Sequence, residues 1–117
     1  MNSLPTEIPV VDAHGHTLDL AFKGGRPLHK SLGGLTDVPL MRAGGVAAQL
    51  TACWVPDAAV GGPHGSRQPL WQALQLIDYL HDQLAGIAGE YALLATAAAD
   101  IEAAYRSGKI AFVLGLE

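Results

Sequence analysis

VVDAHGH, residues 10–16, is the stretch of this sequence that decides the fold. It belongs to a nearly continuous apolar run over 8–13, and short runs of this kind are typical of strands buried on both faces of a parallel sheet. His14 and His16 follow the run, two positions apart. Side chains at positions i and i+2 share one face of a strand, so both imidazoles can converge on one ion. Imidazole suits zinc and related divalent metals, although two histidines in a surface loop would give the same pattern.

The rest of the chain alternates between helical patterns and apolar runs. Beyond the first strand, the patterns predict in order a loop over 17–36, a short helix from Thr36-Asp37 through Arg42, a strand over 46–55, a loop over 56–67, a helix over 70–84, a short extended piece over 91–95, a helix over 97–107 and a strand over 110–116. This alternation indicates βαβ units and therefore a parallel α/β sheet. The 117 residues are within the usual size of one domain, and we expect roughly three strands.

Composition limits the classes of function. The 117 residues carry a net charge of −4 with only 7 Lys plus Arg and no basic run, which argues against nucleic-acid binding. No run of about 18 apolar residues is present, so no membrane span is expected. The N-terminus lacks the charged and apolar regions of a signal peptide, and a cytoplasmic location is the resulting expectation. Cys53, the single cysteine, excludes an internal disulfide and is expected to be a small buried hydrophobe.

A further candidate ligand stands at the end of the last predicted strand. Glu117 follows the apolar run over 110–116, where an isolated carboxylate is costly unless it finds a partner such as a metal; an ordinary solvated residue is the alternative. In βα-barrel enzymes the active site lies at the carboxyl ends of the strands, where Glu117, His14 and His16 all fall. Asp12 is expected to orient an imidazole through a hydrogen bond, with direct ligation or strand-end capping as alternatives.

Several other residues are weaker candidates: His29 and His64 in the long loops, Trp54 at the end of the second strand, Asp19 and Asp57. Solvated or turn positions are expected for the two aspartates. The two histidines are expected to be solvated, with substrate contact as the alternative. Trp54 either lines a pocket or packs in the core or at its rim. No phosphate-binding glycine loop and no Gly-x-Ser-x-Gly nucleophile motif is present.

Four stretches together resemble the membrane (renal-type) dipeptidase family, peptidase family M19. They are VVDAHGHTLDL over 10–20, DVPLMRAGGVAAQL over 37–50, ALQLIDYLH over 73–81 and DIEAAYRSGKIAFVLGLE over 100–117. Their order and spacing are similar to those of the family over nearly the whole chain. The resemblance implies an α/β fold that forms the N-terminal portion of a metal-dependent (β/α)8 TIM barrel.

The resemblance also implies a function, that of a zinc-dependent dipeptidase: a hydrolase that carries a binuclear Zn2+ site and cleaves dipeptides. By position, His14 is a ligand of the first metal, and Glu117 is the catalytic carboxylate that bridges both metals. His16 departs from the family, which usually has aspartate there. His-x-His is the pattern of the wider amidohydrolase superfamily, so His16 is still expected to be a ligand, with one negative charge fewer at the site.

The length of the chain qualifies this function. A whole (β/α)8 barrel needs about 250 residues, so residues 1–117 are expected to be one partial domain, the N-terminal part of a dipeptidase barrel. As such a fragment the chain is expected to be inactive alone. The resemblance implies second-metal histidines and a catalytic aspartate beyond Glu117. The expected partner is a dipeptide substrate, and binding to nucleic acid or to a membrane is not expected. The complete enzyme is a possible homodimer. Two rivals stay open: another amidohydrolase-like metal-dependent hydrolase, such as a phosphoesterase or deoxyribonuclease, and a non-catalytic remnant.

Overall fold

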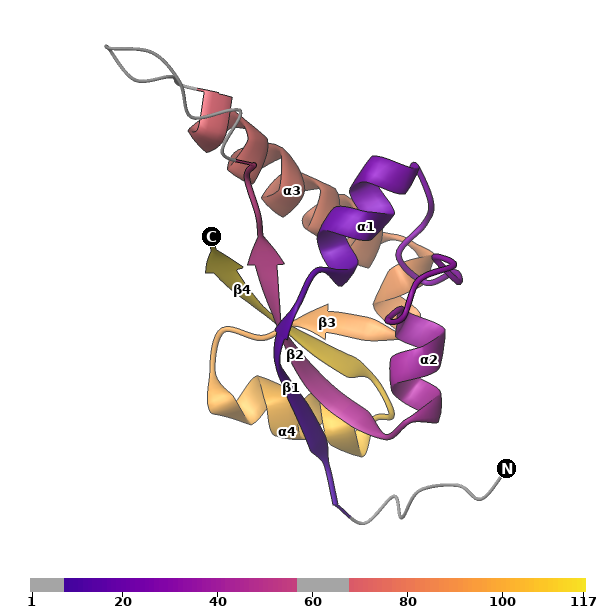
Figure 1. Cartoon of the computed structure of the whole chain (residues 1–117). Helices are drawn as coiled ribbons and strands as arrows, with labels where there is room; N and C mark the ends of the chain where they lie inside the picture. Colours follow the sequence, from indigo (N-terminus) through magenta and orange to yellow (C-terminus); the bar gives the residue numbers. More distant parts are fainter. Residues whose placement is uncertain (1–7, 57–67) are drawn as a thin grey trace.

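The computed structural model describes residues 8–56 and 68–117. Its elements are, in chain order, β1 (Val10–Gly15), α1 (Thr17–Gly24), α2 (Val38–Ala43), β2 (Val46–Cys53), α3 (Gln68–Ala85), the short 3₁₀ helix η2 (Ile87–Glu90), β3 (Ala92–Leu94), α4 (Ala98–Arg106) and β4 (Ile110–Leu116) (Figure 1). The three strands and three helices expected from the sequence are confirmed within a few residues. His64 and Asp57 lie outside the described residues. Among the helices that are described, none has the length and apolar character needed to span a membrane.

The strands form one parallel sheet in the order β1-β2-β4-β3. β2 and β4 pair over a long stretch, from Ala48 opposite Ala111 to Cys53 opposite Leu116. β3 pairs with only the first part of β4, from Ile110 to Phe112. The three expected strands are thus joined by a fourth. The short piece expected over 91–95 is a fourth strand, and it lies on the far side of β4.

The strand order explains why helices cover both faces of the sheet. The chain passes from β2 to β3 across the position of β4, and then returns to fill that position. Parallel crossovers are right-handed, so the reversal of direction moves the connecting helix to the opposite face. Accordingly, α1, α2 and α3 lie on one face and α4 on the other (Figure 1). The buried residues beneath α4 are small, Ala48, Ala95, Ala104 and Ala111, and larger side chains such as Ile101 pack around them.

The main core lies between the sheet and the helices α1, α2 and α3. Phe112 and Ile110 of β4 and Leu80 of α3 are at most 1% exposed, and Leu18 of α1 packs in the same cluster. Burying one side chain of this size contributes about 1.5–3 kcal/mol. This packing fixes β4, and with it the position of Glu117, the residue that follows the strand.

β1 is more exposed than its apolar sequence predicts. Val10 and Val11 are 45% and 53% exposed, so the expectation of a strand buried on both faces is wrong for the described residues. The reason is that β1 pairs with β2 on one side and with no described strand on the other. An edge strand of this kind leaves a row of backbone groups open to further pairing.

Helix α1 replaces the first part of the loop expected over 17–36. Leu18 and Ala21 are fully buried on one face of this helix, and Asp19 and Lys23 form an i,i+4 ion pair at 3.0 Å. Gly25 follows the helix in the left-handed conformation, with φ of 60°. Glycine takes this conformation without strain after a helix, so Gly24-Gly25 marks a helix end within the expected loop.

Candidate metal centre

Three candidate ligands meet at the carboxyl edge of the sheet. His14 lies near the end of β1, His16 directly precedes α1, and Glu117 directly follows β4. β1 and β4 are both paired with β2 and parallel to it, so their carboxyl ends lie at the same edge. Barrel enzymes carry their active sites at this edge. The structure therefore brings together all three residues that the sequence suggested as metal ligands.

Each of the three side chains directs one donor atom to a common point. Nε2 of His14 lies 3.2 Å from Nε2 of His16 and 3.3 Å from Oε2 of Glu117. Nε2 of His16 lies 3.5 Å from the same oxygen. A tetrahedral zinc ion with ligands at about 2.0–2.1 Å holds them about 3.3–3.4 Å apart. The spacing fits one divalent ion, and two imidazole nitrogens with a carboxylate oxygen form a donor set that zinc accepts.

The backbone between β1 and α1 turns both imidazoles toward this point. Gly15 ends β1 and pairs with Thr51 of β2. His16 occupies the N-cap position of α1 but makes no capping hydrogen bond with its side chain, so its ring is not held by the start of the helix. The two imidazole rings meet edge to face, with their centroids 5.1 Å apart. The pair is thus arranged by the strand-to-helix turn.

Glu117 is held by the backbone ladder between β2 and β4. Its N–H donates to the carbonyl of Cys53 at 3.3 Å, and its carbonyl accepts from the N–H of Val55 at 3.2 Å. The side chains of His14, His16 and Glu117 are 60%, 38% and 44% exposed. Ion pairs this exposed to water add little stability. The backbone around the three ligands, and not the contacts within the cluster, positions them.

Asp12 binds backbone and amide groups instead of an imidazole. Its carboxylate accepts from the N–H of His14 at 3.1 Å and from Nε2 of Gln49 at 2.8 Å. The expectation that Asp12 orients an imidazole is corrected, because its two oxygens are engaged by these two donors. Gln49 is fully buried in β2, and it was not among the site residues expected from the sequence. In the sequence, Gln49 could have been found as the one amide side chain inside the apolar run over 46–55.

Trp54 lines a pocket beside the cluster. Its ring meets the His16 ring edge-on, with centroids 6.2 Å apart, and the ammonium of Lys23 lies 4.3 Å from its centroid. Lys23 also pairs with Asp19, which was expected to be solvated but is only 6% exposed. The pocket, of about 270 Å³, is bounded by α1, α3 and Trp54. Packing of Trp54 against His16 links the candidate centre to these helices.

His29 lies away from the cluster. Its ring stacks on Tyr91, with centroids 6.1 Å apart and an angle of 14° between the planes. The carbonyl of Tyr91 accepts from the N–H of Ile110, at the amino end of β4. His29 therefore lies toward the opposite edge of the sheet from Glu117, and it packs on an aromatic ring where solvation was expected. A contact between His29 and a substrate at the cluster has no support in this arrangement.

A smaller cavity opens directly at the candidate ligands. It has a volume of about 170 Å³ and is lined by His14 and Glu117 together with apolar residues of β2 and β4, among them Leu50 and Val113. A small apolar group can therefore lie on the sheet beside the three donor atoms. This is the arrangement expected of a pocket for a small substrate, in which apolar walls surround a few polar groups.

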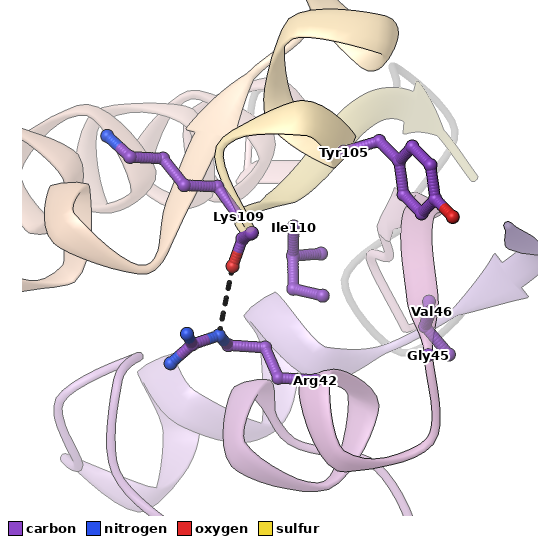
Figure 2. Close-up of a pocket in the computed structure, with 7 residues that line it drawn as sticks. Arg42, Gly45, Val46, Tyr105, Lys109 and Ile110 are labelled. Atoms are coloured by element: carbon purple, nitrogen blue, oxygen red, sulfur yellow. Dashed lines mark hydrogen bonds between the residues drawn. The ribbon is translucent and has the colours of Figure 1, made fainter. Parts of the chain in front are cut away.

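A larger cavity, of about 380 Å³, lies at the amino edge of the sheet. Figure 2 shows it between Arg42, Tyr105, Lys109 and Ile110. The Nε of Arg42 donates to the carbonyl of Gly108 at 3.2 Å, so this side chain ties α2 to the turn after α4. Residues at this edge of barrel folds serve stability and not catalysis. We therefore assign the chemistry to the carboxyl edge despite the smaller volume there.

Two groups have pKa values raised by burial. Loss of solvation raises the pKa of the Cys53 thiol and of the Tyr79 hydroxyl. Cys53 is 1% exposed, which confirms the expectation of a small buried hydrophobe, and a buried protonated thiol is a poor nucleophile. The Tyr79 hydroxyl donates to the carbonyl of Arg26 at 2.6 Å. Neither side chain belongs to the candidate metal centre.

The candidate ligands lie at the carboxyl edge of a parallel sheet, which is where barrel enzymes carry their active sites. The chain belongs to the membrane dipeptidase family, peptidase family M19, whose family model matches residues 1–117. Its fold is the N-terminal part of the barrel-like fold of these dipeptidases. No curated protein matches the sequence.

Two solved structures share this fold. The dipeptidase AC, a metallopeptidase of family M19, has a TM-score of 0.73 and 22% identity over 94% of this chain and 35% of its own. A metallopeptidase from Rhodobacter sphaeroides, solved with a phosphinate mimic of the dipeptide L-Ala-D-Ala, has a TM-score of 0.66 and 20% identity over 94% of this chain and 38% of its own. The chain thus spans little more than a third of the length of these proteins.

Proposed function

We propose that this chain forms the first metal-binding part of a zinc-dependent dipeptidase. The observation that carries the proposal is the convergence of His14, His16 and Glu117 within 4.8 Å of one another at the carboxyl edge of the sheet. Membership of the M19 family supports dipeptides as the substrate class. The dipeptide mimic bound to the Rhodobacter sphaeroides metallopeptidase supports L-Ala-D-Ala as the first substrate to test.

The three side chains have distinct tasks in this proposal. His14 and His16 are neutral ligands, and Glu117 is the anionic one. Three protein ligands leave a coordination position open to water or substrate, as in catalytic zinc sites. When bound, zinc supplies an activated water and polarises the carbonyl that the water attacks. Glu117 has a second carboxylate oxygen with which it can bridge to another ion, and the remaining ligands of a binuclear site would come from outside the described residues.

The pocket at the cluster supports a small dipeptide. Leu50 and Val113 line the cavity that His14 and Glu117 also line, so an alanine side chain can rest on the sheet while its carbonyl faces the ligands. Since the chain spans only 35–38% of the two dipeptidase structures, we propose that it does not hydrolyse dipeptides without further barrel residues.

Zinc titration of the whole chain tests the ligand set. We expect the wild type to bind one Zn2+, and His14→Ala, His16→Ala and Glu117→Gln each to bind it more weakly. His81→Ala is the matched control, because His81 is an exposed histidine of α3 outside the cluster. If His16→Ala binds zinc as tightly as the wild type, His16 is not a ligand.

A chimera tests the substrate class. In it, this chain replaces the structurally equivalent part of the Rhodobacter sphaeroides metallopeptidase, with the parent enzyme as control. Hydrolysis of L-Ala-D-Ala that disappears in the His14→Ala chimera supports the proposal. A folded, zinc-loaded chimera that leaves the dipeptide intact, or that prefers a phosphodiester, contradicts it.

A further inference from the structure

Gln49 is a buried polar side chain that the fold alone does not require. It lies in β2, between β1 and β4, and is 0% exposed. Its Nε2 donates to Asp12 at 2.8 Å, but its Oε1 is buried without a hydrogen-bond partner. A buried acceptor without a partner lowers stability relative to an apolar side chain of similar size. A glutamine in this position therefore indicates a role other than packing.

Gly15 provides the space that the Gln49 amide occupies. A Cβ at Gly15 would overlap both the amide nitrogen and the amide carbon of Gln49, and it would lie 3.0 Å from Oδ2 of Asp12. The amide thus lies against the backbone that separates His14 from His16. Gly15, Gln49 and Asp12 form one packed group beside the candidate ligands.

This group lies where the pairing of β1 with β2 is irregular. The register shifts between Asp12 and Gly15, so His14 is not held by regular strand pairing. Oδ1 of Asp12 instead accepts from the N–H of His14 at 3.1 Å. One oxygen of Asp12 is held by Gln49 and the other holds His14. Side-chain hydrogen bonds therefore replace the β1–β2 backbone pairing at His14, the residue whose imidazole must face the cluster.

We propose that Gln49 is a positioning residue for the candidate metal centre. It holds Asp12, Asp12 holds the backbone of His14, and His14 thereby faces the same point as His16. The inference rests on the proposed function, since it concerns the same ligands. The amide nitrogen of Gln49 donates to Asp12, so Gln49 acts on the cluster through Asp12 and His14.

The variant Gln49→Met tests this role in the full chain, because methionine keeps the length of the side chain and removes the amide. Gln83→Met is the matched control: Oε1 of Gln83 accepts from the N–H of Leu28 at 2.8 Å, away from the cluster. Three quantities are measured: zinc affinity by calorimetric titration, hydrogen exchange of the His14 amide, and the thermal midpoint. Loss of a group that orients a metal ligand typically weakens metal binding by about 10- to 100-fold.

We expect Gln49→Met to weaken zinc binding within this range and to speed exchange at His14, while Gln83→Met changes neither. Asp12→Asn should stay close to the wild type, because Gln49 can turn its amide and accept from Asn with Oε1. Unchanged zinc affinity and unchanged His14 exchange in Gln49→Met overturn the inference.

Asp12→Ala provides the same test if Gln49→Met does not fold, since Asp12 is only half-buried. It should accelerate exchange at His14 and weaken zinc binding; a wild-type result in both measurements overturns the inference. If the wild type binds no zinc, the proposed function fails. The inference is then decided by exchange at His14 alone, so the two failures are distinguishable.

Discussion

Replacement of Gly15 by alanine is the perturbation that bears most directly on the packing behind the candidate ligands. The added Cβ would overlap the Gln49 amide, and Gln49 is fully buried, so this side chain has no solvent to move into. Either the amide leaves Asp12 or β1 shifts away from β2. Both responses disturb the residues on either side of Gly15, which are His14 and His16.

The expected loss of stability follows from two contributions. Inserting a methyl group into a filled site costs about 1–3 kcal/mol. Breaking the hydrogen bond from Gln49 to the Asp12 carboxylate costs about 1.5–3 kcal/mol, and the lower half of that range applies because Asp12 is partly exposed. The free energy of unfolding should therefore fall by about 3 kcal/mol, a large part of the 5–15 kcal/mol typical of a folded domain.

Urea unfolding measures this loss. With a slope of about 1.5 kcal/mol per molar urea, the midpoint of Gly15→Ala should fall by about 2 M. Gln49→Ala removes the two amide atoms that the new Cβ would overlap. The loss of stability in the double variant should therefore be smaller than the sum of the two single losses by about 1–3 kcal/mol.

Gly24→Ala is the control for this experiment. A Cβ at Gly24 meets nothing closer than Arg26 Cγ at 4.0 Å, and alanine in a helix is favoured over glycine by about 0.5–1 kcal/mol. This variant should be at least as stable as the wild type. If Gly15→Ala unfolds at the wild-type midpoint, or if its effect and that of Gln49→Ala simply add, the Gln49 amide does not fill the space beside Gly15.

Three further predictions concern the rest of the fold. Asp37→Ala should cost about 2–4 kcal/mol in urea unfolding, because the buried carboxylate caps α2 and accepts three hydrogen bonds; a loss below about 1 kcal/mol would contradict this. Hydrogen bonds from the N–H groups of Thr96 and Ala97 lower the pKa of Asp100, so its contribution to stability is present above the ordinary aspartate range and is lost as the pH falls through the lowered pKa. The difference in urea midpoint between the wild type and Asp100→Asn should therefore vanish in acid, and a difference independent of pH would exclude this role. Cys53, with its raised pKa and buried position, should react with a thiol reagent far more slowly in the native chain than in urea; equal rates would show that it is accessible.

The ligand cluster could be predicted from the sequence because the carboxyl ends of all strands in a parallel sheet lie at the same edge. The spacing of His14 and His16 and the position of Glu117 after an apolar run need no knowledge of side-chain packing. Gln49 was not predicted, because its role depends on a register shift between β1 and β2 that no local pattern encodes. The correct partner of Asp12 was missed for the same reason.

Two features of the fold were predicted less well, for different physical reasons. Helix α1 has only a short amphipathic pattern, and the glycines that follow it favoured the prediction of a loop over 17–36. In the structure these glycines end the helix. The exposure of β1 and the placement of β3 beyond β4 depend on which strands become neighbours. Apolar composition indicates that a strand can be buried, but it does not say what covers it.

X-ray absorption at the zinc edge of the zinc-loaded chain tests whether His14, His16 and Glu117 form a metal centre. We expect one bound ion with two imidazole nitrogens at about 2.0–2.1 Å and carboxylate or water oxygens in the remaining positions. His16→Ala should remove one of the two imidazoles from the spectrum, and His81→Ala should remove none. A spectrum of oxygen ligands alone, or one unchanged by His16→Ala, would contradict the assignment of His14, His16 and Glu117 as a metal centre.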